Sequence, residues 1–576
     1  MDIRGLKTDV LILGAGGAGL FAALHAHQAD PSLDITIAVK GLLGKCGCTR
    51  MVQGGYNVAL APGDSVERHF MDTIEGGKWL PDQELAWTLV TGAVERIREL
   101  ENELGCFFDR NPDGTVHQKA FAGQTFDRTV HKGDLTGIEI MSRLAEQVWA
   151  RGINRLEEYR ALDFITARDG GIAGVLMFDV RSGEPLFVQA KAVLLATGGG
   201  PTMYRYHTPS GDKSCDGLAM ALRFGLPLRD MEMVQFHPTG LLAGEHTRMT
   251  GTVLEEGLRG AGGHLLGGDG NRFMQHYDPR AERATRDVVS RAIFAEIRVG
   301  NTTPNGGVWI SMAHLGPENV QRQFKGMVER CADCGFDLAG GLVEVVPTAH
   351  YMMGGVEFAP DGTTEREGLF VAGEDSGGVH GANRLGGNGV ANSTVFGGIA
   401  GDTMAKVVQR GAPWRDPDID ILVASAQRAL APFAPAGGGA AGELEAIRER
   451  LYATMWDDAG IVRDAAGLAR AATVLGELAD ALDRYRLPAM ARDRAFNMTW
   501  HDWLNLGSLV AVSQVIVRAA QARENSRGAH YRADFPDAGE LETSVYTRIR
   551  ADSLGELRVE AVPVEFTRVR PGQSLV

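Results

Sequence analysis

The segment Thr8-Asp9-Val10-Leu11-Ile12-Leu13-Gly14-Ala15-Gly16-Gly17-Ala18-Gly19 decides the fold of this chain. Residues 8–13 end in the apolar run 10–13 and are typical of a buried parallel strand, and residues 18–29 have the composition of the helix that follows. A second apolar run at 35–39 completes a predicted β-α-β unit. The sequence therefore predicts an α/β protein that begins with a Rossmann-like domain.

The glycines at the end of the first strand indicate a phosphate-binding turn. Gly14 permits a tight turn, Gly16 lets a pyrophosphate approach the backbone, and Gly19 allows the helix to pack closely on the strand. The phosphates would then meet free N–H groups at the positive end of the helix. On this motif alone, a packing turn without a ligand stays an alternative.

Other segments choose the cofactor. Lys40 follows the second strand, where an acidic residue usually binds the ribose, so a simple NAD site is disfavoured. Three more glycine-rich stretches occur, at 53–55, at 196–200 and at 368–374, and the last is a strand that ends in Glu374. Bare backbone beside a flat ring system, together with an acid for ribityl and ribose hydroxyls, indicates FAD.

The residues expected to bind FAD come from all of these turns. They are Gly14, Ala15, Gly16, Gly17, Ala18, Gly19, Lys40, Cys48, Thr49, Gln53, Gly54, Gly55, Ala196, Thr197, Gly198, Asp216, Glu374, Arg384, Asn388 and Gly389.

Composition excludes several classes of protein. Acidic residues outnumber basic ones by 73 to 58, and the resulting charge of −15 argues against nucleic-acid binding. No apolar run approaches the length of a membrane span, because Ser513 and Gln514 interrupt the longest one at 509–517. Without a signal segment, we expect a cytoplasmic protein that docks on the inner face of a membrane only through a partner.

Cysteine usage favours a reducing compartment. The six cysteines are few for 576 residues. Cys331 and Cys334 form a lone C-x-x-C motif without a second pair at metal-site spacing, so a structural role is favoured over redox or metal chemistry. We expect no metal site in this chain.

Changes in texture along the chain predict four parts. The FAD-binding domain is discontinuous, at 1–240 and 346–415, and a capping domain of the α+β type at 241–345 is inserted into it. A helical bundle follows at 416–530, with a linker near 431–442 that is rich in Ala, Pro and Gly. Residues 531–576 are expected to form a short β-containing tail.

With these segments in view, the chain resembles the flavoprotein family of succinate dehydrogenase, fumarate reductase and L-aspartate oxidase. The resemblance runs from Thr8 to about Met404 and more weakly to Arg532. Its motifs are Gln235-Phe236-His237-Pro238-Thr239-Gly240, Glu256-Gly257-Leu258-Arg259-Gly260, Arg286-Asp287-Val288-Val289-Ser290-Arg291, Pro347-Thr348-Ala349-His350-Tyr351-Met352-Met353-Gly354-Gly355, His380-Gly381-Ala382-Asn383-Arg384-Leu385-Gly386 and Ala522-Arg523-Glu524-Asn525-Ser526-Arg527-Gly528-Ala529-His530.

The resemblance implies a set of residues that hold a substrate carboxylate. These are His237, His350 and Arg384, since an arginine offers a bidentate fork and a histidine a further donor. Phe121 matches an aromatic residue that packs on the unsaturated carbons of the substrate, although an ordinary core phenylalanine is the alternative.

The resemblance also implies a proton-transfer group. Arg286 matches the family's proton-transfer arginine, with Glu256 and Arg259 as the relay to solvent. A free guanidinium hardly deprotonates, so a purely electrostatic clamp is the alternative, whereas clustered positive charge in a closed site would favour transient proton loss.

The sequence departs from the family pattern at three places. Cys48 occupies the position of the histidine that bonds covalently to FAD in membrane-complex members, so we expect noncovalent FAD, with a cysteinyl bond as the minor alternative. Glu255 replaces a threonine that helps bind a substrate carboxylate, and an unpaired carboxylate there would repel a dianion. We therefore expect one end of the substrate to be neutral or cationic unless Glu255 is protonated or paired. Gly389 replaces a serine, which removes one hydroxyl contact to the flavin.

The leading expectation is an enzyme of the fumarate reductase or succinate dehydrogenase type that transfers hydride between flavin N5 and the carbon beside a substrate carboxylate. Its small carboxylate substrate would be saturated or desaturated, and an iron–sulfur partner would exchange the electrons, because this chain lacks a cysteine set for a cluster. The alternatives are a stand-alone amino acid oxidase like L-aspartate oxidase, a non-enzymatic flavin electron-transfer module and a simple NAD dehydrogenase.

Overall fold

The computed structural model describes residues 2–244, 247, 249–434, 442–488, 491–552 and 554–576. Its largest sheet has seven strands in the order β6-β2-β1-β9-β8-β7, with β16 also paired to β9. These strands are β1 (Arg4–Leu13), β2 (Ile35–Val39), β6 (Asn154–Glu157), β7 (Tyr159–Thr166), β8 (Ile172–Asp179), β9 (Pro185–Leu195) and β16 (Leu369–Val371). β1 runs parallel to β2 and to β9, so the β-α-β unit predicted at the N-terminus is confirmed.

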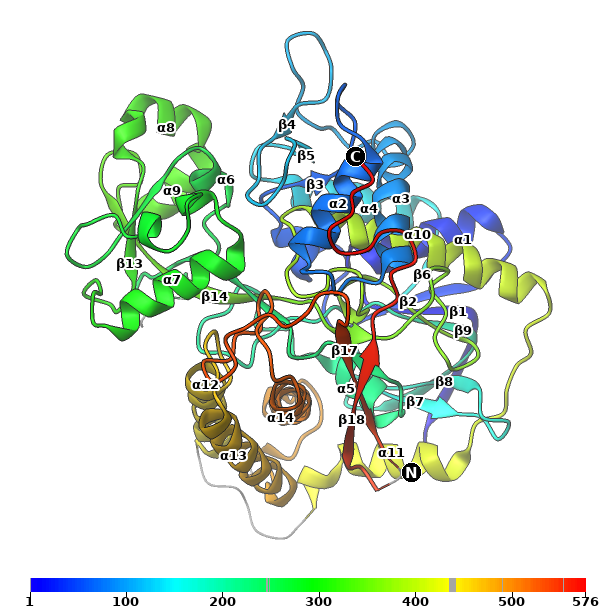
Figure 1. Cartoon of the computed structure of the whole chain (residues 1–576). Coiled ribbons are helices and arrows are strands. Elements are labelled where there is room, and N and C mark those ends of the chain that lie inside the picture. The colour runs from blue at the N-terminus through cyan, green and yellow to red at the C-terminus, as the bar shows by residue number, and fades with distance from the viewer. Residues whose placement is uncertain (1, 245–246, 248, 435–441, 489–490, 553) are drawn as a thin grey trace.

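Two helices pack closely on this sheet. α1 (Gly17–Ala29) follows β1, and α10 (Asn388–Gln409) lies against it along its length (Figure 1). Glycines in α10 make this approach feasible, since a Cβ on Gly397 would lie 2.6 Å from the carbonyl oxygen of Ala18 and one on Gly401 only 2.3 Å from that of Ala22. α1 is buried over most of its length, as its apolar composition on all faces requires.

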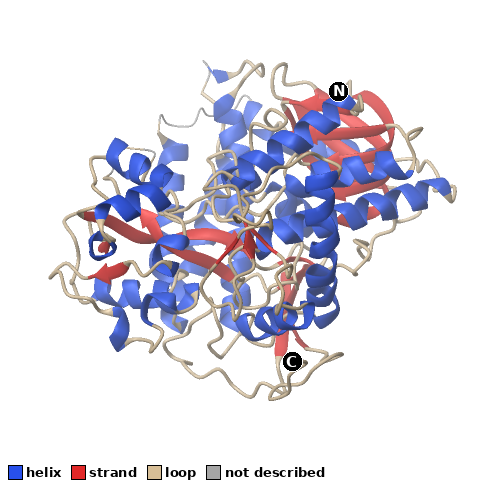
Figure 2. Cartoon of the chain, turned by 90° about the horizontal axis from the view of Figure 1, so that it is seen from above, coloured by secondary structure: helices blue, strands red, loops and turns tan. Residues whose placement is uncertain are grey.

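A second unit projects from one side of the molecule, where Figure 1 shows it in green and Figure 2 shows its strands apart from the main sheet. Its four-stranded sheet has the order β11-β14-β13-β12. The elements are β11 (Val234–Leu241), β12 (His264–Leu266), β13 (Val308–Ser311), β14 (Leu342–Met352), α6 (Gly257–Gly260), α7 (Arg286–Arg298), α8 (Pro317–Gln323) and α9 (Lys325–Asp333). β11 and β14 connect this unit to the rest of the chain, which places their residues between the two.

The C-terminal part is helical and then returns to strand. The helices are α11 (Ile419–Ala429), α12 (Glu443–Asp458), α13 (Ala465–Arg484) and α14 (Met498–Ala522). β17 (Val545–Ala551) and β18 (Leu557–Pro563) form a hairpin, and β17 pairs with β10 (Leu228–Arg229), which pairs with β15 (Gly355–Val356). Most of the linker expected near 431–442 lies outside the described residues.

α14 corrects the estimate of apolar length made from the sequence. An 18-residue window of this 25-residue helix has a mean hydropathy of 1.3, and among the described residues it is the one helix long and apolar enough to cross a membrane. The apolar run at 509–517 is shorter than the helix because Ser513 and Gln514 do not interrupt it. The Ser513 hydroxyl donates to the carbonyl of Leu509 one turn earlier. In this structure 61% of its apolar window is buried, much of it against α13.

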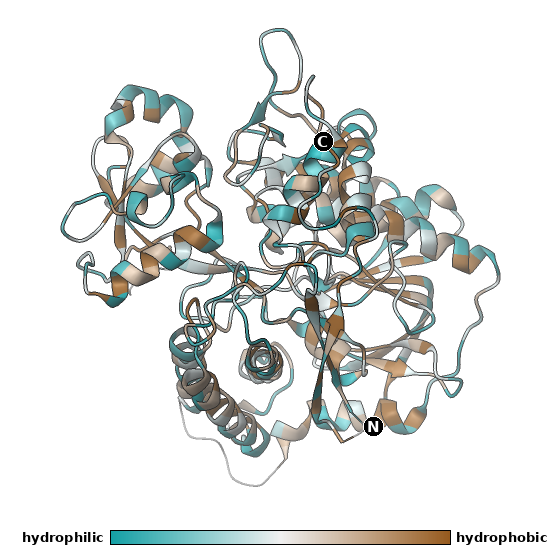
Figure 3. Cartoon of the chain, in the orientation of Figure 1, coloured by the Kyte–Doolittle hydropathy of each residue, from teal (hydrophilic) through white to brown (hydrophobic). Residues whose placement is uncertain are grey.

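The remaining elements surround the first unit. They are α2 (Val66–Gly76), α3 (Gln83–Asn102), α4 (Thr136–Ala150), α5 (Asp216–Arg223), β3 (Tyr56–Asn57), β4 (Gln118–Lys119) and β5 (Thr129–Val130). In Figure 3 the hydrophobic colour concentrates on the strands and the inward faces of the helices. The predicted class, α/β with an added helical region, is confirmed, while the predicted domain boundaries stay a prediction.

Candidate active site

A cavity of about 640 Å³ runs between the two units. This volume lies in the range of cofactor and substrate pockets. Of the residues selected from the sequence, those that line it are Gly14, Ala15, Gly16, Gly17, Ala18, Lys40, Cys48, Thr49, Gln53, Gly54, Gly55, Phe121, Ala196, Thr197, Gly198, Asp216, His237, Glu255, Glu256, Arg286, His350, Glu374, Arg384 and Gly389. Segments that are far apart in the sequence thus line one cavity.

The start of α1 forms one end of this cavity. A Cβ on Gly16 would meet no protein atom closer than 3.7 Å, where Thr49 Oγ1 lies, so the space beside its backbone is open to a ligand. Thr49 Oγ1 also accepts a hydrogen bond from the Gly17 N–H at 3.2 Å, which ties the 48–51 turn to the helix. An open backbone at a helix N-terminus suits the pyrophosphate of FAD.

The end of β2 carries an ion pair instead of a lone acid. Lys40 Nζ lies 2.8 Å from Asp216 Oδ2, and Arg160 Nη2 lies 2.6 Å from Asp216 Oδ1. Burial alone would raise the pKa of Asp216, but the two cations hold it below its usual range. Asp216 thus brings a carboxylate to the end of β2, where an acidic residue usually binds the ribose. This carboxylate is already paired with Lys40 and Arg160.

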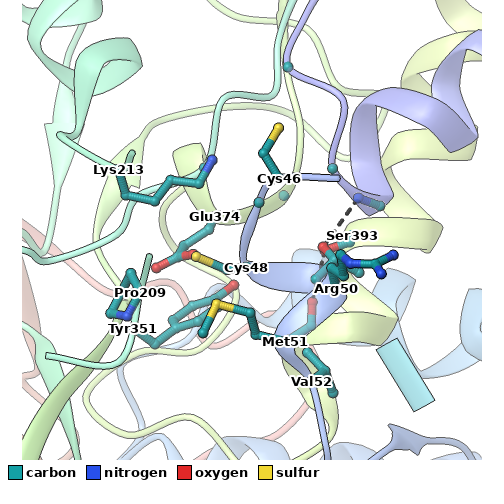
Figure 4. A pocket seen from close by; sticks show the side chains of 18 of the residues that line it. Cys46, Cys48, Arg50, Met51, Val52, Pro209, Lys213, Tyr351, Glu374 and Ser393 are labelled. Atoms are coloured by element: carbon teal, nitrogen blue, oxygen red, sulfur yellow. Dashed lines mark hydrogen bonds between the residues drawn. The ribbon is translucent and has the colours of Figure 1, made fainter. Parts of the chain in front are cut away.

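Glu374 supplies a second carboxylate to the cavity wall (Figure 4). Its Oε1 accepts from the backbone N–H groups of Met352 at 2.9 Å and Gly200 at 3.3 Å, which fixes the side chain. Burial raises its pKa. Gln53 Oε1 is a further buried acceptor with no protein partner among the described residues, as expected for an atom that a flavin N–H would satisfy.

Two thiols and an ammonium group lie in this part of the cavity. Figure 4 shows Lys213 pointing between Cys46 and Cys48, with Glu374 beside Cys48. Burial raises the pKa of the Cys48 thiol to about 12. The thiol therefore stays protonated near neutral pH, and a protonated thiol is a poor nucleophile.

At the other end of the cavity, three residues form a buried charge chain. Arg286 Nη2 lies 2.6 Å from Glu256 Oε2, and Arg259 Nη2 lies 3.1 Å from Glu256 Oε1. Burial would raise the pKa of Glu256, but the two guanidinium groups lower it. Gln235 Oε1 accepts a third bond from Arg286 at 3.0 Å, which orients the guanidinium. Arg259 does not line the cavity; it lies behind Glu256, where a relay residue would be.

Two histidines from neighbouring strands face the same end. His237 on β11 and His350 on β14 have ring centroids 5.4 Å apart. Burial, together with the positive charge of Arg286, lowers the pKa of both well below the usual value, so both rings are neutral near pH 7. His237 Nδ1 accepts a hydrogen bond from the Thr239 N–H at 3.3 Å. Nδ1 is therefore the unprotonated nitrogen of this neutral ring, and Nε2 carries the N–H donor. Thr208 Oγ1 holds His350 Nδ1 at 2.8 Å.

Arg384 completes the set of cations. Its guanidinium carbon lies 4.4 Å from the ring centroid of Tyr351, and its Nε is buried without a protein partner among the described residues. Burial and then the charge of Arg286 lower its pKa to about 10, so it stays protonated at neutral pH. A buried cation with an unused donor is suited to an anionic ligand.

Phe121 is wedged between two glycine turns. A Cβ on Gly54 would lie 2.5 Å from Phe121 Cζ, and a Cβ on Gly386 would lie 2.6 Å from Phe121 Cδ2. The ring can therefore occupy this place only because both positions are glycine. It contributes an apolar wall to the cavity, as expected for a residue that packs on substrate carbons.

Glu255 has a cationic partner. Its Oε2 lies 3.2 Å from Lys119 Nζ, and the carboxylate is 5% exposed. Burial raises the pKa of Glu255, while Lys119 opposes that rise. Because Lys119 pairs with Glu255, this carboxylate need not repel a dianion. The substrate therefore does not need a neutral or cationic end.

Two selected cofactor residues do not line the cavity. Gly19 packs against the phosphate turn, since its Cβ would lie 2.0 Å from the Gly14 carbonyl oxygen. Asn388 turns inward: its Oδ1 lies 2.9 Å from both Asn57 Nδ2 and His69 Nε2. Its role is to anchor the start of α10, which carries Gly389 to the cavity wall.

Sequence reasoning missed several groups at the site. The main ones are Lys213, Tyr351, Thr208, Gln235, Lys119 and Arg330. Gln235 and Tyr351 lie inside the sequence motifs at 235–240 and 347–355, which could have indicated them as site residues. Lys119, Thr208, Lys213 and Arg330 had none, because only the folded chain brings them to the cavity or to its charged residues.

Comparisons with known proteins identify the family of this chain. The FAD binding domain family matches residues 9–390, and the fumarate reductase flavoprotein C-terminal family matches residues 448–575. One of the subunits of the CoM/CoB fumarate reductase of Methanothermobacter marburgensis is 40% identical over 542 residues, which is 93% of this chain and 96% of that protein. The Escherichia coli fumarate reductase flavoprotein subunit is 34% identical, covering 99% and 96% of the two chains.

A solved structure extends the similarity to the fold. A Glu-to-Gln variant of the flavoprotein of Escherichia coli quinol fumarate reductase has a TM-score of 0.92 at 33% identity and covers 99% of both chains. The chain belongs to the fumarate reductase and succinate dehydrogenase flavoprotein family. It is an FAD-dependent oxidoreductase. The matches support the fumarate reductase or succinate dehydrogenase type over the amino acid oxidase, electron-transfer module and NAD dehydrogenase alternatives.

Proposed function

We propose that this enzyme interconverts a small unsaturated dicarboxylate of the fumarate type and its saturated counterpart of the succinate type. The observation that carries the proposal is the joint placement of Arg286, Arg384 and two neutral histidines at one end of the FAD cavity. The carboxylates of Glu255 and Glu256 at this end of the cavity are paired with cationic side chains. This end of the cavity therefore favours a dianionic substrate. The similarity to fumarate reductase flavoproteins supports the same substrate class.

His237, His350 and Arg384 would hold the substrate. Arg384 has a buried Nε without a protein partner among the described residues, and the neutral rings offer N–H donors without adding charge. Hydrogen bonds to a charged carboxylate are stronger than those between neutral groups, and burial strengthens them further. Phe121 would press the apolar carbons into place and exclude water.

Bound FAD supplies the hydride acceptor or donor for the carbon–carbon bond. Arg286 would hold the proton that is exchanged with the neighbouring carbon. Its guanidinium can release a proton only if positive charge nearby favours the neutral form and Glu256 can take the proton up. Arg259, buried behind Glu256, would continue the route and restore the original protonation state.

We propose that the FAD is held without a covalent bond. Cys48 has a protonated thiol near neutral pH, and protonated thiols do not attack carbon centres efficiently. The helix N-terminus at Gly16, the acceptor of Gln53 and the carboxylate of Glu374 offer ample noncovalent contacts.

We propose that the electrons pass to or from an iron–sulfur protein. The related Methanothermobacter and Escherichia coli proteins are named as subunits, which supports a multi-subunit assembly here. Attachment to a membrane would be through that partner, and the location of the chain stays a prediction.

Steady-state assays with artificial electron carriers test the proposal without the partner. Purified, FAD-loaded enzyme should reduce fumarate with a reduced viologen dye or oxidise succinate with an electron-accepting dye. Hydrogen peroxide formation from an amino acid, with no turnover of either dicarboxylate, would refute the proposal.

A further inference from the structure

The substrate end has a second set of charged residues, which are Glu255 and Arg330 of the inserted unit and Lys119 of the first unit. Glu255 and Arg330 line the cavity itself, together with Thr252 and Val253. Lys119 on β4 lies behind Glu255, at 3.2 Å from its Oε2. None of the three has a role in the proton-transfer chain of Glu256, so their function needs a separate explanation.

The chain fixes Glu255 close to the substrate-holding histidines. The Leu254 N–H donates to the Thr239 carbonyl at 2.9 Å, and the Thr239 hydroxyl donates to the Leu254 carbonyl at 3.1 Å. Thr239 also meets His237 Nδ1 through its backbone N–H. Glu255 is the next residue, so its backbone is held to the strand that carries His237.

Arg330 reaches the same wall from helix α9 of the inserted unit. Its Nη1 donates to the Val253 carbonyl at 3.3 Å, which leaves most of its guanidinium donors for other partners. Within the described part of the chain, no carboxylate oxygen lies within 4.0 Å of Arg330. The charge of Arg330 lowers the pKa of Glu255, but the two side chains form no ion pair. A half-buried guanidinium at a cavity wall with unused donors is suited to bind a ligand carboxylate.

We propose that Arg330 binds the carboxylate of a dicarboxylate substrate that lies farther from Arg384, and that Lys119 allows this by neutralising Glu255. Arg330 is then a specificity-determining residue, and Lys119 is a positioning residue that acts through Glu255. This inference rests on the proposed function and names the residues that distinguish a dicarboxylate from a monocarboxylate. Without Lys119, an ionised Glu255 would repel the carboxylate that Arg330 attracts.

The test is equilibrium binding of malonate, a non-reacting dicarboxylate, to oxidised FAD-loaded enzyme, read from the change in the flavin spectrum and by calorimetry. Arg330→Met should weaken malonate binding about 10- to 100-fold, the range for losing a hydrogen bond to a charged group. Acetate binding and flavin content should stay unchanged. Arg322→Met on α8, an exposed arginine of the same unit, is the matched control and should bind malonate normally.

Two further variants test the role of Lys119. Lys119→Met should weaken malonate binding, and adding Glu255→Gln to it should restore most of the affinity because the repelling charge is removed. A structural defect at Lys119 would not be rescued in this way.

The outcomes separate this inference from the proposed function. If the unaltered enzyme binds malonate and Arg330→Met binds it equally well, the inference is wrong while the proposed function stands. If the unaltered enzyme binds no dicarboxylate, both are wrong. A Lys119→Met variant with undiminished malonate affinity would remove Lys119 from the account.

Discussion

Replacing Glu256 by glutamine should block proton transfer while leaving substrate binding intact. In the structure, Glu256 Oε1 accepts a hydrogen bond from Arg259 at 3.1 Å, and its Oε2 accepts two from Arg286, at 2.6 Å from Nη2 and 3.2 Å from Nε. An amide has only one acceptor oxygen, so one arginine would face an NH₂ group instead. The variant therefore keeps the shape of the side chain but loses the charge, the proton acceptor and the hydrogen bonds to one of its two oxygens.

The size of the effect follows from these contacts. Loss of a positioned proton acceptor should lower kcat about 10²- to 10⁴-fold. Removing one partner of a buried ion pair should cost up to about 3–5 kcal/mol of stability. KM for fumarate should stay the same or fall, because the removal of a negative charge makes the substrate end more positive.

The assay is viologen-coupled fumarate reduction under anaerobic conditions, normalised to bound flavin. Thermal unfolding and flavin content confirm that the variant is folded. A folded variant whose kcat remains within about threefold of the original, a barrier change below 1 kcal/mol, would refute the role of Glu256 in proton transfer. A raised KM with unchanged kcat would instead show that Glu256 binds substrate.

Three other predictions concern the cofactor and the ion pair beside it. Gly16→Ala should fold normally, since the nearest protein atom would lie at an ordinary contact distance of 3.7 Å from its Cβ, but it should bind FAD more weakly. Gly19→Ala should lower the melting temperature because its Cβ would lie 2.0 Å from a backbone oxygen. Acid denaturation should release all flavin from the unaltered enzyme, and Cys48→Ala should retain its FAD. Asp216→Asn should lower the melting temperature most at neutral pH, because the pKa of Asp216 is lowered in the folded protein. That contribution is present above the unfolded pKa of about 3.9 and is lost as the pH falls through the folded value, so the difference should shrink below about pH 4.

Each of these has a clear contrary result. Equal FAD affinity in Gly16→Ala would place the pyrophosphate elsewhere. Yellow colour that stays with the precipitated protein, and is absent in Cys48→Ala, would establish a cysteinyl bond. A melting-temperature difference for Asp216→Asn that grows in acid would show that Lys40 and Arg160 do not stabilise its charged form.

The parts of the fold set by local sequence pattern could be predicted. The apolar run ending at Leu13 and the glycines after it determine a strand, a turn and a helix within a short stretch, and the structure confirms them. The length of α14 was underestimated, because polar residues in a buried helix can bond to the preceding turn or to neighbouring segments.

The site could be predicted only where residues lie in recognisable motifs. Asn388 stands in such a motif, yet its side chain turns to a buried network of Asn57 and His69, which no local pattern reveals. The pairing of Lys119 with Glu255 joins residues 136 positions apart and reverses the expected effect of Glu255 on substrate charge. Long-range electrostatic partners depend on the folded arrangement and leave no periodic signal in the sequence.

The most direct measurement of the central claim is the reoxidation of reduced, protein-bound FAD by fumarate. The flavin is reduced anaerobically with one equivalent of dithionite, and its visible absorbance is followed in a stopped-flow instrument after mixing with fumarate. The account predicts that the oxidised spectrum returns and that one succinate forms per flavin, with Arg286→Lys strongly slowed. Flavin that stays reduced with fumarate, but is reoxidised rapidly by oxygen alone, would contradict it.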